Sequence, residues 1–238
     1  MCAILFYEYI SEYNVILDNL DYIEILLWAI SIIIMFIIGT IFLIDVKKGT
    51  LNKVFIFVGL FFYWFIAGRI CRLIAKFLVG YEYGFFEFEG VLLVLAILYT
   101  ITTYAGLFFI SYFFEKTYIK KTHFMFSVLV IVAAVLSIVN YEFPDIMLLL
   151  TPIYIIVLLG IPLVFINLAI KGSGSVRRKA LMVAIGVIIF VLGIAFDVPE
   201  AAVIWMNVPG LPEFAKFASP IFQIIGIILL YFGFPREI

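Results

Sequence analysis

Residues 22–49 read YIEILLWAISIIIMFIIGTIFLIDVKKG, an apolar run followed at once by an acid and two lysines. About 20 apolar residues allow a helix to cross the hydrocarbon core of a bilayer, and the run over 22–44 is long enough. Backbone polar groups cannot stay unpaired in hydrocarbon, so a long apolar run without strand-like alternation favours a helix. Residues 22–44 are therefore predicted to form a membrane-spanning helix that ends at DVKKG.

The whole chain has the same character. Of its 238 residues, 67% are hydrophobic and 13% are charged, whereas soluble domains have roughly 45–50% and about 25%. The mean hydropathy is +1.29. We therefore expect an all-α integral membrane protein, with a short interfacial segment at 1–21 and one seven-helix domain over 22–238. The predicted spans are 22–44, 54–78, 91–114, 124–141, 146–170, 180–196 and 214–234.

The basic residues alternate from loop to loop along the chain. Lysine and arginine concentrate on the cytoplasmic side of membrane proteins. The N-terminal segment and the connections after even-numbered spans carry acids and no bases. This pattern predicts an external N-terminus and a cytoplasmic C-terminus, in the cytoplasmic membrane of a prokaryote. The bases on the predicted cytoplasmic side are Lys47, Lys48, Lys53, Lys116, Lys120, Lys121, Lys171, Arg177, Arg178, Lys179 and Arg236.

The composition also argues against several classes of site. The net charge of −1 gives no reason to expect a nucleic-acid partner, whereas the apolar spans imply membrane lipid as a partner. The single histidine, His123, and two distant cysteines, Cys2 and Cys71, leave no cluster of metal ligands. We expect no metal, no disulfide and no cofactor, and no catalytic residue is assigned.

The second span carries charges inside the membrane. Arg69, Arg72 and Lys76 are spaced i, i+3, i+7, which places them on one stripe of a helix. A central arginine costs at least about 2.5–3.5 kcal/mol on insertion scales, so this stripe should face the bundle. Lys76 is expected to extend to the interface, and Arg72 is ambiguous. Arg69 lies roughly 13 Å below the outer boundary, so it should need a carboxylate, a water-filled cavity or an anionic ligand.

Two interpretations of the stripe remain open: an internal ion-pair network and an anion-binding pocket that opens to the outside. The candidate ion-pair partners are Glu24, Glu87, Glu89 and Asp197. Tyr104 and Gln223 are polar groups at mid-depth that would extend a ligand site, although hydrogen bonds between helices are the simpler explanation for both. The hypothetical ligand-binding residues are Arg69, Arg72, Tyr104 and Gln223.

Three features suggest a resemblance to a known family: the seven-span topology, the short loops and the stretch GSGSVRRKALMVAIGVIIFVLGIAFD at 172–197. The chain resembles the seven-helix sensor region found ahead of archaeal and bacterial membrane histidine kinases, over nearly its whole length. The resemblance implies an outward-facing pocket within the bundle and a signal passed inward. The chain ends at FPREI without a kinase, so such a sensor would act through a partner, and no functional residue is carried over. The stretch GSGSVRRK itself is expected to be a flexible cytoplasmic segment attracted to anionic lipid.

The leading hypothesis is a stand-alone receptor or sensor that binds a small anionic or amphiphilic ligand in the outer half of the bundle. It would signal to a cytoplasmic partner through the basic loops, and a homo-oligomer is left open. The first alternative is an anion or small-solute transporter or channel, which the few polar residues of the inner half, such as Asn167, disfavour. The second is a lipid-active membrane enzyme that uses Glu87, Glu89 or Asp197, which the lack of a nucleophile or metal constellation disfavours.

Overall fold

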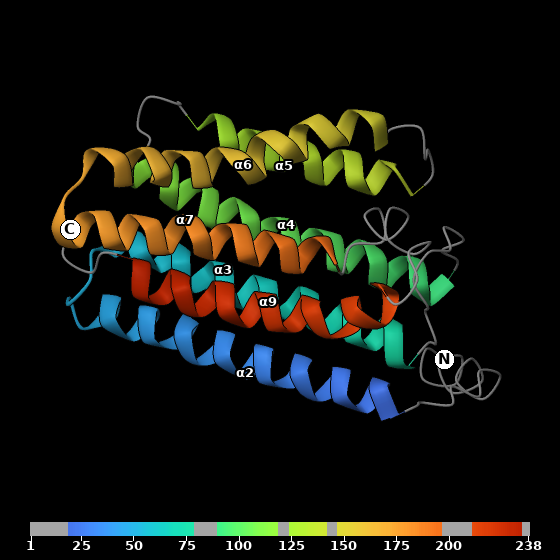
Figure 1. Cartoon of the computed structure of the whole chain (residues 1–238). Helices are drawn as coiled ribbons and strands as arrows, with labels where there is room; N and C mark the ends of the chain where they lie inside the picture. Colours follow the sequence, from blue (N-terminus) through green and yellow to red (C-terminus); the bar gives the residue numbers. More distant parts are fainter. Residues whose placement is uncertain (1–18, 79–89, 119–123, 142–146, 197–210, 235–238) are drawn as a thin grey trace.

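The computed structural model describes residues 19–78, 90–118, 124–141, 147–196 and 211–234. Within these residues the protein is all-helical, and seven long helices run side by side in one bundle (Figure 1). A short 3-10 turn, η1 (Lys53–Phe55), comes directly before helix α3, and a π-helical turn, η2 (Ile74–Leu78), comes directly after it. The long helices are α2 (Asn19–Lys47), α3 (Ile56–Leu73), α4 (Gly90–Thr117), α5 (Met125–Val139), α6 (Met147–Lys171), α7 (Gly174–Ala195) and α9 (Leu211–Gly233).

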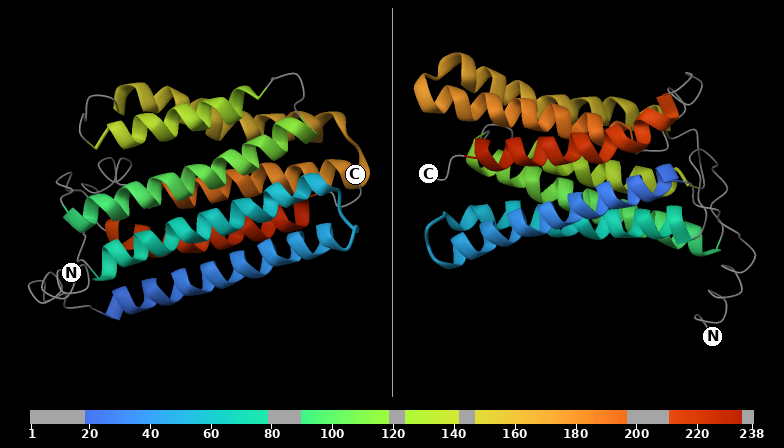
Figure 2. Two further views of the ribbon diagram at one scale, coloured as in Figure 1. Left: turned by 180° about the vertical axis from the view of Figure 1, so that it is seen from behind. Right: turned by 60° about the horizontal axis from the view of Figure 1, so that its bottom comes forward.

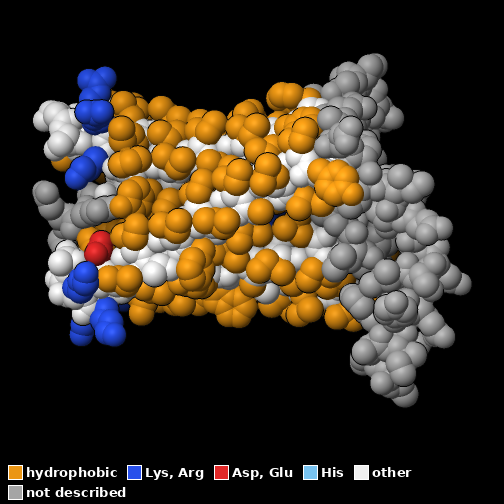
Figure 3. Space-filling view, turned by 90° about the horizontal axis from the view of Figure 1, so that it is seen from below, with side chains coloured by type: hydrophobic (Ala, Val, Ile, Leu, Met, Phe, Trp, Pro, Cys, Tyr) orange, Lys and Arg blue, Asp and Glu red, His pale blue; other side chains and the backbone are white. Residues whose placement is uncertain are grey.

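The flanks of the bundle are apolar. In Figure 3, hydrophobic side chains form a continuous belt, and lysine and arginine side chains gather at one end of it. Large apolar side chains such as Leu26, Phe36 and Phe232 are exposed on these flanks, as expected for a surface that faces lipid. By length and composition, five described segments can cross a membrane: Asp21–Lys47, Lys53–Lys76, Gly90–Thr117, Gly174–Ala195 and Phe214–Gly233. Two shorter apolar stretches, Met125–Val139 and Leu159–Lys171, accompany them.

The seven helices form a closed ring. Each one packs against the next in chain order, and α9 completes the ring by packing against α2. Figures 1 and 2 show that consecutive helices run in opposite directions. We call the end at which α2 begins the N-side, and the end at which α9 finishes the C-side. The most extensive contacts are those between α7 and α9 and between α3 and α4.

Glycines bring α7 and α9 into backbone contact. A Cβ atom added at Gly226 would lie 2.7 Å from the backbone nitrogen of Phe190 and 2.8 Å from the carbonyl oxygen of Gly186. No side chain larger than a hydrogen fits there unless the helices separate. Small residues allow this kind of close approach between membrane helices, where dispersion contacts hold the interface together.

The C-side half of the bundle is filled by phenylalanine. Neighbouring ring centroids lie about 5–6 Å apart, for example 5.0 Å between Phe55 and Phe113 and 5.5 Å between Phe113 and Phe234. Rings at such distances add attraction beyond their buried area. We call this group the aromatic core. It consists of Phe42, Phe55, Phe61, Phe62, Phe65, Phe113, Phe114, Phe165, Phe190 and Phe234, all of them buried.

One local expectation from the sequence is wrong. The stretch GSGSVRRK was expected to be a flexible segment, but α7 begins at Gly174, so its basic residues belong to the first turns of a helix. Only Gly172 and Ser173 separate α6 from α7. Hydropathy marks where a helix enters lipid, and a helix can continue beyond that point because its backbone hydrogen bonds do not depend on the surrounding solvent. For the same reason α2, at Asn19–Lys47, extends past the predicted span 22–44 at both ends.

Candidate ligand-binding site

Four charged side chains meet on the N-side between α2, α3 and η2. They are Glu24, Arg69, Arg72 and Lys76, and we call them the charged cluster. Glu24 and Arg69 are 0% and 1% exposed, and Arg72 is 7% exposed. Ionised groups are rarely buried in membrane helices unless they are paired or serve a function. The stripe predicted from the sequence therefore does face the bundle.

Lys76 does not extend to the interface as expected. Its Nζ atom forms an ion pair with Oε1 of Glu24, and its side chain is only 9% exposed. The indole Nε1 of Trp28, one turn along α2, donates a hydrogen bond of 3.3 Å to the same carboxylate oxygen. A carboxylate within reach on the neighbouring helix lowers the cost of a buried cation, and this contact replaces solvation at the membrane surface.

Aromatic rings surround the guanidinium group of Arg69. Its Cζ atom lies 4.6 Å from the ring centroid of Phe65, 5.0 Å from that of Trp28 and 5.8 Å from that of Tyr99. Each such contact contributes about 0.5–1 kcal/mol at exposed sites and about 2 kcal/mol when it is desolvated. Together they are comparable with the insertion cost of a central arginine, about 2.5–3.5 kcal/mol on insertion scales.

The sequence analysis did not identify these rings. Phe65 lies four residues before Arg69 on the same helix, a spacing that brings two side chains together, so this contact could have been found. The other two come from α2 and α4, and nothing in the sequence says which faces of those helices meet α3. Close packing of α3 on α4 determines the position of Tyr99. A Cβ atom at Gly68 would lie 2.7 Å from Oγ1 of Thr103, one turn further along α4.

Arg72, on α3, also packs against α4. Its Cζ atom lies 5.9 Å from the ring centroid of Tyr99, so this one ring contacts both arginines. At the rim of the site, Lys216 on α9 forms an ion pair of 2.9 Å with Asp21 on α2. The N-side therefore joins α2, α3, α4 and α9 through charged and aromatic side chains.

Gln223, on α9, lies at about the depth of Arg69, and α9 and α3 both pack against α2. The rings of Phe65 and Phe190 are 5.1 Å apart, and Phe190 contacts α9 at Gly226. Arg69 lies one helical turn after Phe65 on α3, and Gln223 lies one turn before Gly226 on α9. Both residues are therefore one turn closer to the N-side than this contact. The two residues therefore belong to one polar level directly above the aromatic core.

The side chain of Gln223 is fully buried and half satisfied. Its Nε2 donates to Oγ of Ser219 at 3.3 Å, and that hydroxyl donates to the carbonyl oxygen of Gly193 at 2.6 Å. Its Oε1 atom has no hydrogen-bond partner among the residues that the structure describes. The hydroxyl oxygens of Ser31 and Thr103 are in the same situation. Buried polar atoms without a hydrogen-bond partner are rare. The Oε1 atom of Gln223 could accept a hydrogen bond from a donor group of a ligand or a water molecule.

The remaining candidates have other positions. Tyr104 and Ser137 form a hydrogen bond of 2.7 Å between their hydroxyls, which links α4 to α5. Asn167 is exposed on α6. The proposed ion-pair partners Glu87, Glu89 and Asp197 lie outside the described residues, so their role stays a prediction. The described structure thus brings Arg69 and Arg72 to the same ring, that of Tyr99, and it gives Tyr104 a partner on another helix.

A buried carboxylate that the sequence analysis overlooked lies on the C-side. Glu115, on α4, accepts hydrogen bonds of 2.9 Å from the backbone nitrogens of Phe126 and Ser127, at the start of α5. Ser127 also donates its hydroxyl to this carboxylate. Acidic groups stabilise helix N-termini, whose first N–H groups lack partners within the helix. The residue before α5, Phe124, provides no side-chain cap, so the cap comes from α4 and its role is structural.

Comparisons of this chain with models of protein families, with curated proteins and with solved structures found no match.

Proposed function

We propose that this chain is a seven-helix receptor or sensor of a prokaryotic cytoplasmic membrane, with its N-side facing outward. In this proposal a small anionic or amphiphilic molecule binds in the charged cluster and the polar level below it. The observation that carries the proposal is the burial of Arg69 and Gln223 at a similar depth in a largely apolar bundle. Buried polar groups of this kind are costly in a membrane, and their usual justification is a function.

The surrounding groups define the chemistry of a fitting ligand. Aromatic rings contact Arg69 and Arg72, and a guanidinium group offers its N–H donors in its own plane, where a carboxylate or phosphate can accept two of them. Oε1 of Gln223 is an acceptor without a partner in the described part of the chain. A molecule with an acidic group, a nearby hydroxyl or amide donor, and an apolar body would satisfy both requirements.

The aromatic core favours a receptor over a transporter or channel. A permeating anion would have to pass the packed phenylalanine rings that fill the C-side half. Asn167, the polar residue considered for a pathway, is exposed on the flank of α6. A binding site that is closed on one side suits a protein that detects a molecule, and transport would require the core to open.

The proposed orientation follows from the charges on the C-side. Described bases gather there, including Lys47, Lys53 and Lys171, and cytoplasmic loops are enriched in such residues. A Lys48→Cys variant in a cysteine-free background should resist a membrane-impermeant maleimide in intact cells and react after lysis. An Asp145→Cys variant should react in intact cells. The reverse result would place the N-side in the cytoplasm.

A thermal-shift screen tests the ligand site. Purified protein would be heated with a panel of small carboxylates, phosphate esters and fatty acids, because a ligand at 100 times its Kd adds about 2.7 kcal/mol of stability. A hit should raise the Tm of the wild type and of a Lys53→Gln control, and the shift should be lost in Arg69→Gln and reduced in Gln223→Leu. An equal shift in Arg69→Gln would refute the site.

The same hit separates the receptor from the alternative function. Liposomes that contain the protein would be given the radiolabelled compound. A receptor should bind it without accumulation in the lumen. Uptake that depends on Arg69 would identify a transporter.

A further inference from the structure

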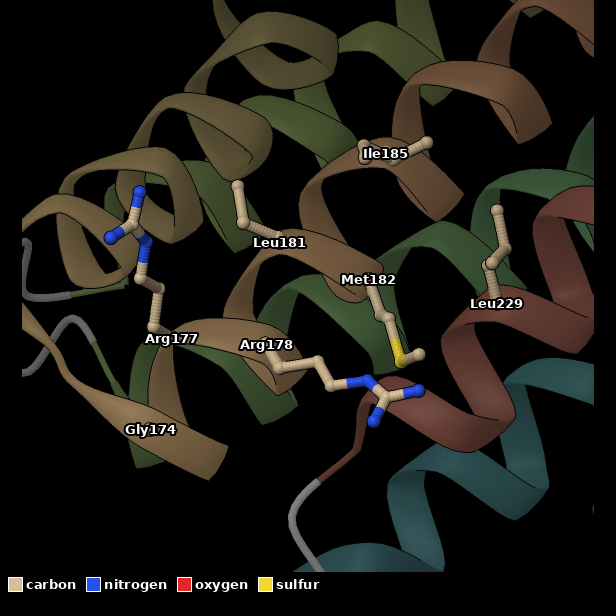
Figure 4. A pocket seen from close by; sticks show the side chains of 7 residues that line it. All are labelled: Gly174, Arg177, Arg178, Leu181, Met182, Ile185 and Leu229. Carbon is tan, nitrogen blue, oxygen red and sulfur yellow. The ribbon is translucent and has the colours of Figure 1, made fainter.

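A groove on the outer surface of the bundle lies between α7 and α9 at the C-side (Figure 4). Its volume is about 350 Å³, at the lower end of the range seen for ligand sites. It is lined by Gly174, Arg177, Arg178, Leu181, Met182, Ile185 and Leu229. It is separate from the charged cluster, which lies inside the N-side half.

The groove is formed by a fixed contact between two helices. Its α7 residues recur every three or four positions, so they share one face of that helix. Leu229 lies on α9 and packs close to α7, since a Cβ atom at Gly186 would lie 3.0 Å from that of Leu229. In Figure 4, Arg178 and Met182 extend toward α9, whereas Arg177 leaves α7 in another direction. The two guanidinium groups thus flank one end of an apolar floor.

Among the described residues, no ion pair neutralises the charge of this end. Arg177 and Arg178 are exposed, and neither forms an ion pair with a residue that the structure describes. They lie in the first turns of α7, which begins at the C-side. Leu181 and Ile185 are exposed beside them, on the flank that would face lipid. The groove therefore has a cationic part at the polar edge of the belt and an apolar part within it.

We propose that this groove binds one anionic phospholipid of the adjacent leaflet. Arg178 holds the phosphate, Arg177 adds positive charge at the other edge of the groove, and the first part of an acyl chain lies along Leu181, Ile185 and Leu229. The start of α7, which Ser173 does not cap with its side chain, adds positive potential at the same end. A zwitterionic lipid carries its own cation beside the phosphate, so it gains less from two arginines. The site does not depend on the proposed receptor function.

Native mass spectrometry of the full chain in detergent tests the site, with phosphatidylglycerol and phosphatidylcholine as competing probes. The Arg177→Gln/Arg178→Gln variant should lose about tenfold or more in affinity for phosphatidylglycerol, with little change for phosphatidylcholine. The matched control is Lys47→Gln/Lys48→Gln, which removes two exposed charges from the same end of the bundle but away from the groove. It should change the affinity less than twofold.

A second variant tests the apolar floor without altering charge. Ile185→Trp places a large side chain in the groove, and Ile185 is exposed, so the fold should tolerate it. This variant should also weaken phosphatidylglycerol binding several-fold. Equal losses in the two charge variants, an unchanged affinity in Ile185→Trp, or equal binding of both lipids by the wild type would each overturn the proposal.

Discussion

The N-side and C-side halves of this bundle are stabilised in different ways. On the N-side, a few charged groups are buried among aromatic rings, and each depends on particular partners: Lys76 on Glu24, and Arg69 on Phe65 and Trp28. On the C-side, phenylalanine rings contact several others at once, as Phe113 contacts Phe55 and Phe234. One half therefore relies on specific pairs, and the other on many interchangeable contacts.

The two kinds of contact should respond differently to a bound ligand. A buried ion pair can be rearranged by a new charge, since its strength depends on a few atoms in a medium of low dielectric constant. A packed apolar core has low compressibility and transmits displacement without offering a binding group. In the proposed receptor, the N-side would bind the ligand, and the C-side would carry a movement of helices toward the basic end.

The largest expected effect is the loss of the carboxylate in the charged cluster. Glu24→Leu should lower the free energy of unfolding by about 3–5 kcal/mol, because it leaves the buried cation of Lys76 without its carboxylate partner. The measurement is reversible unfolding in mixed micelles by SDS titration. The double variant Glu24→Leu/Lys76→Leu should recover part of the loss. Additive losses in the double variant would contradict the pairing of these two residues.

A truncation in the aromatic core should cost less and show no such rescue. Phe113→Ala should lower the free energy of unfolding by about 2–3 kcal/mol, less than in a soluble core, because lipid already surrounds the unfolded helices with apolar groups. Adding Phe42→Ala, a residue of the same core, should increase the loss in the same titration. Recovery in the double variant would show that the two halves do not differ as described.

The cap of α5 should contribute a smaller amount. Glu115→Gln should destabilise the protein by about 0.5–2 kcal/mol, since the amide has only one acceptor oxygen for the N–H groups at the start of α5. Hydrogen exchange of the amides of Phe126 and Ser127 should become faster while that of α3 stays unchanged. Unchanged exchange at α5 would show that Glu115 does not act as its cap.

The smallest effect is expected at the rim of the N-side. Lys216→Met should change the free energy of unfolding by at most about 1 kcal/mol, because the pair with Asp21 is partly exposed. The effect should shrink further at high salt, which screens exposed pairs. A loss as large as that of Glu24→Leu would mean that the pair is part of the buried cluster.

Much of the architecture was predictable because it depends on one segment at a time. Hydropathy located all seven helices, and the i, i+3, i+7 spacing of Arg69, Arg72 and Lys76 placed them on a face that turned out to be buried. The start of α7 was missed because hydropathy reports the entry into lipid and not the first hydrogen-bonded turn. The outward orientation of the N-side stays a prediction from the charge pattern.

The site itself was predictable only in part. The sequence singled out Arg69 as the residue whose burial needs compensation, and it named Glu24 as a candidate partner. It could not show that Glu24 pairs with Lys76, or that rings from three helices surround Arg69. These outcomes depend on which helix faces meet, and the short separation of α3 and α4 at Gly68 has no signature that distinguishes it from any other glycine in a span.

The sequence alone thus determined the number of helices, the distribution of charge between the two ends and the stripe of cations on α3. Each of these follows from composition and periodicity, which are properties of a single helix in lipid. Only the tertiary structure decided the partner of Lys76, the rings around Arg69, the cap that Glu115 gives to α5 and the groove between α7 and α9. Those features arise where two or more helices meet, and the contacts that select one arrangement of seven apolar helices over another are short-ranged and cooperative.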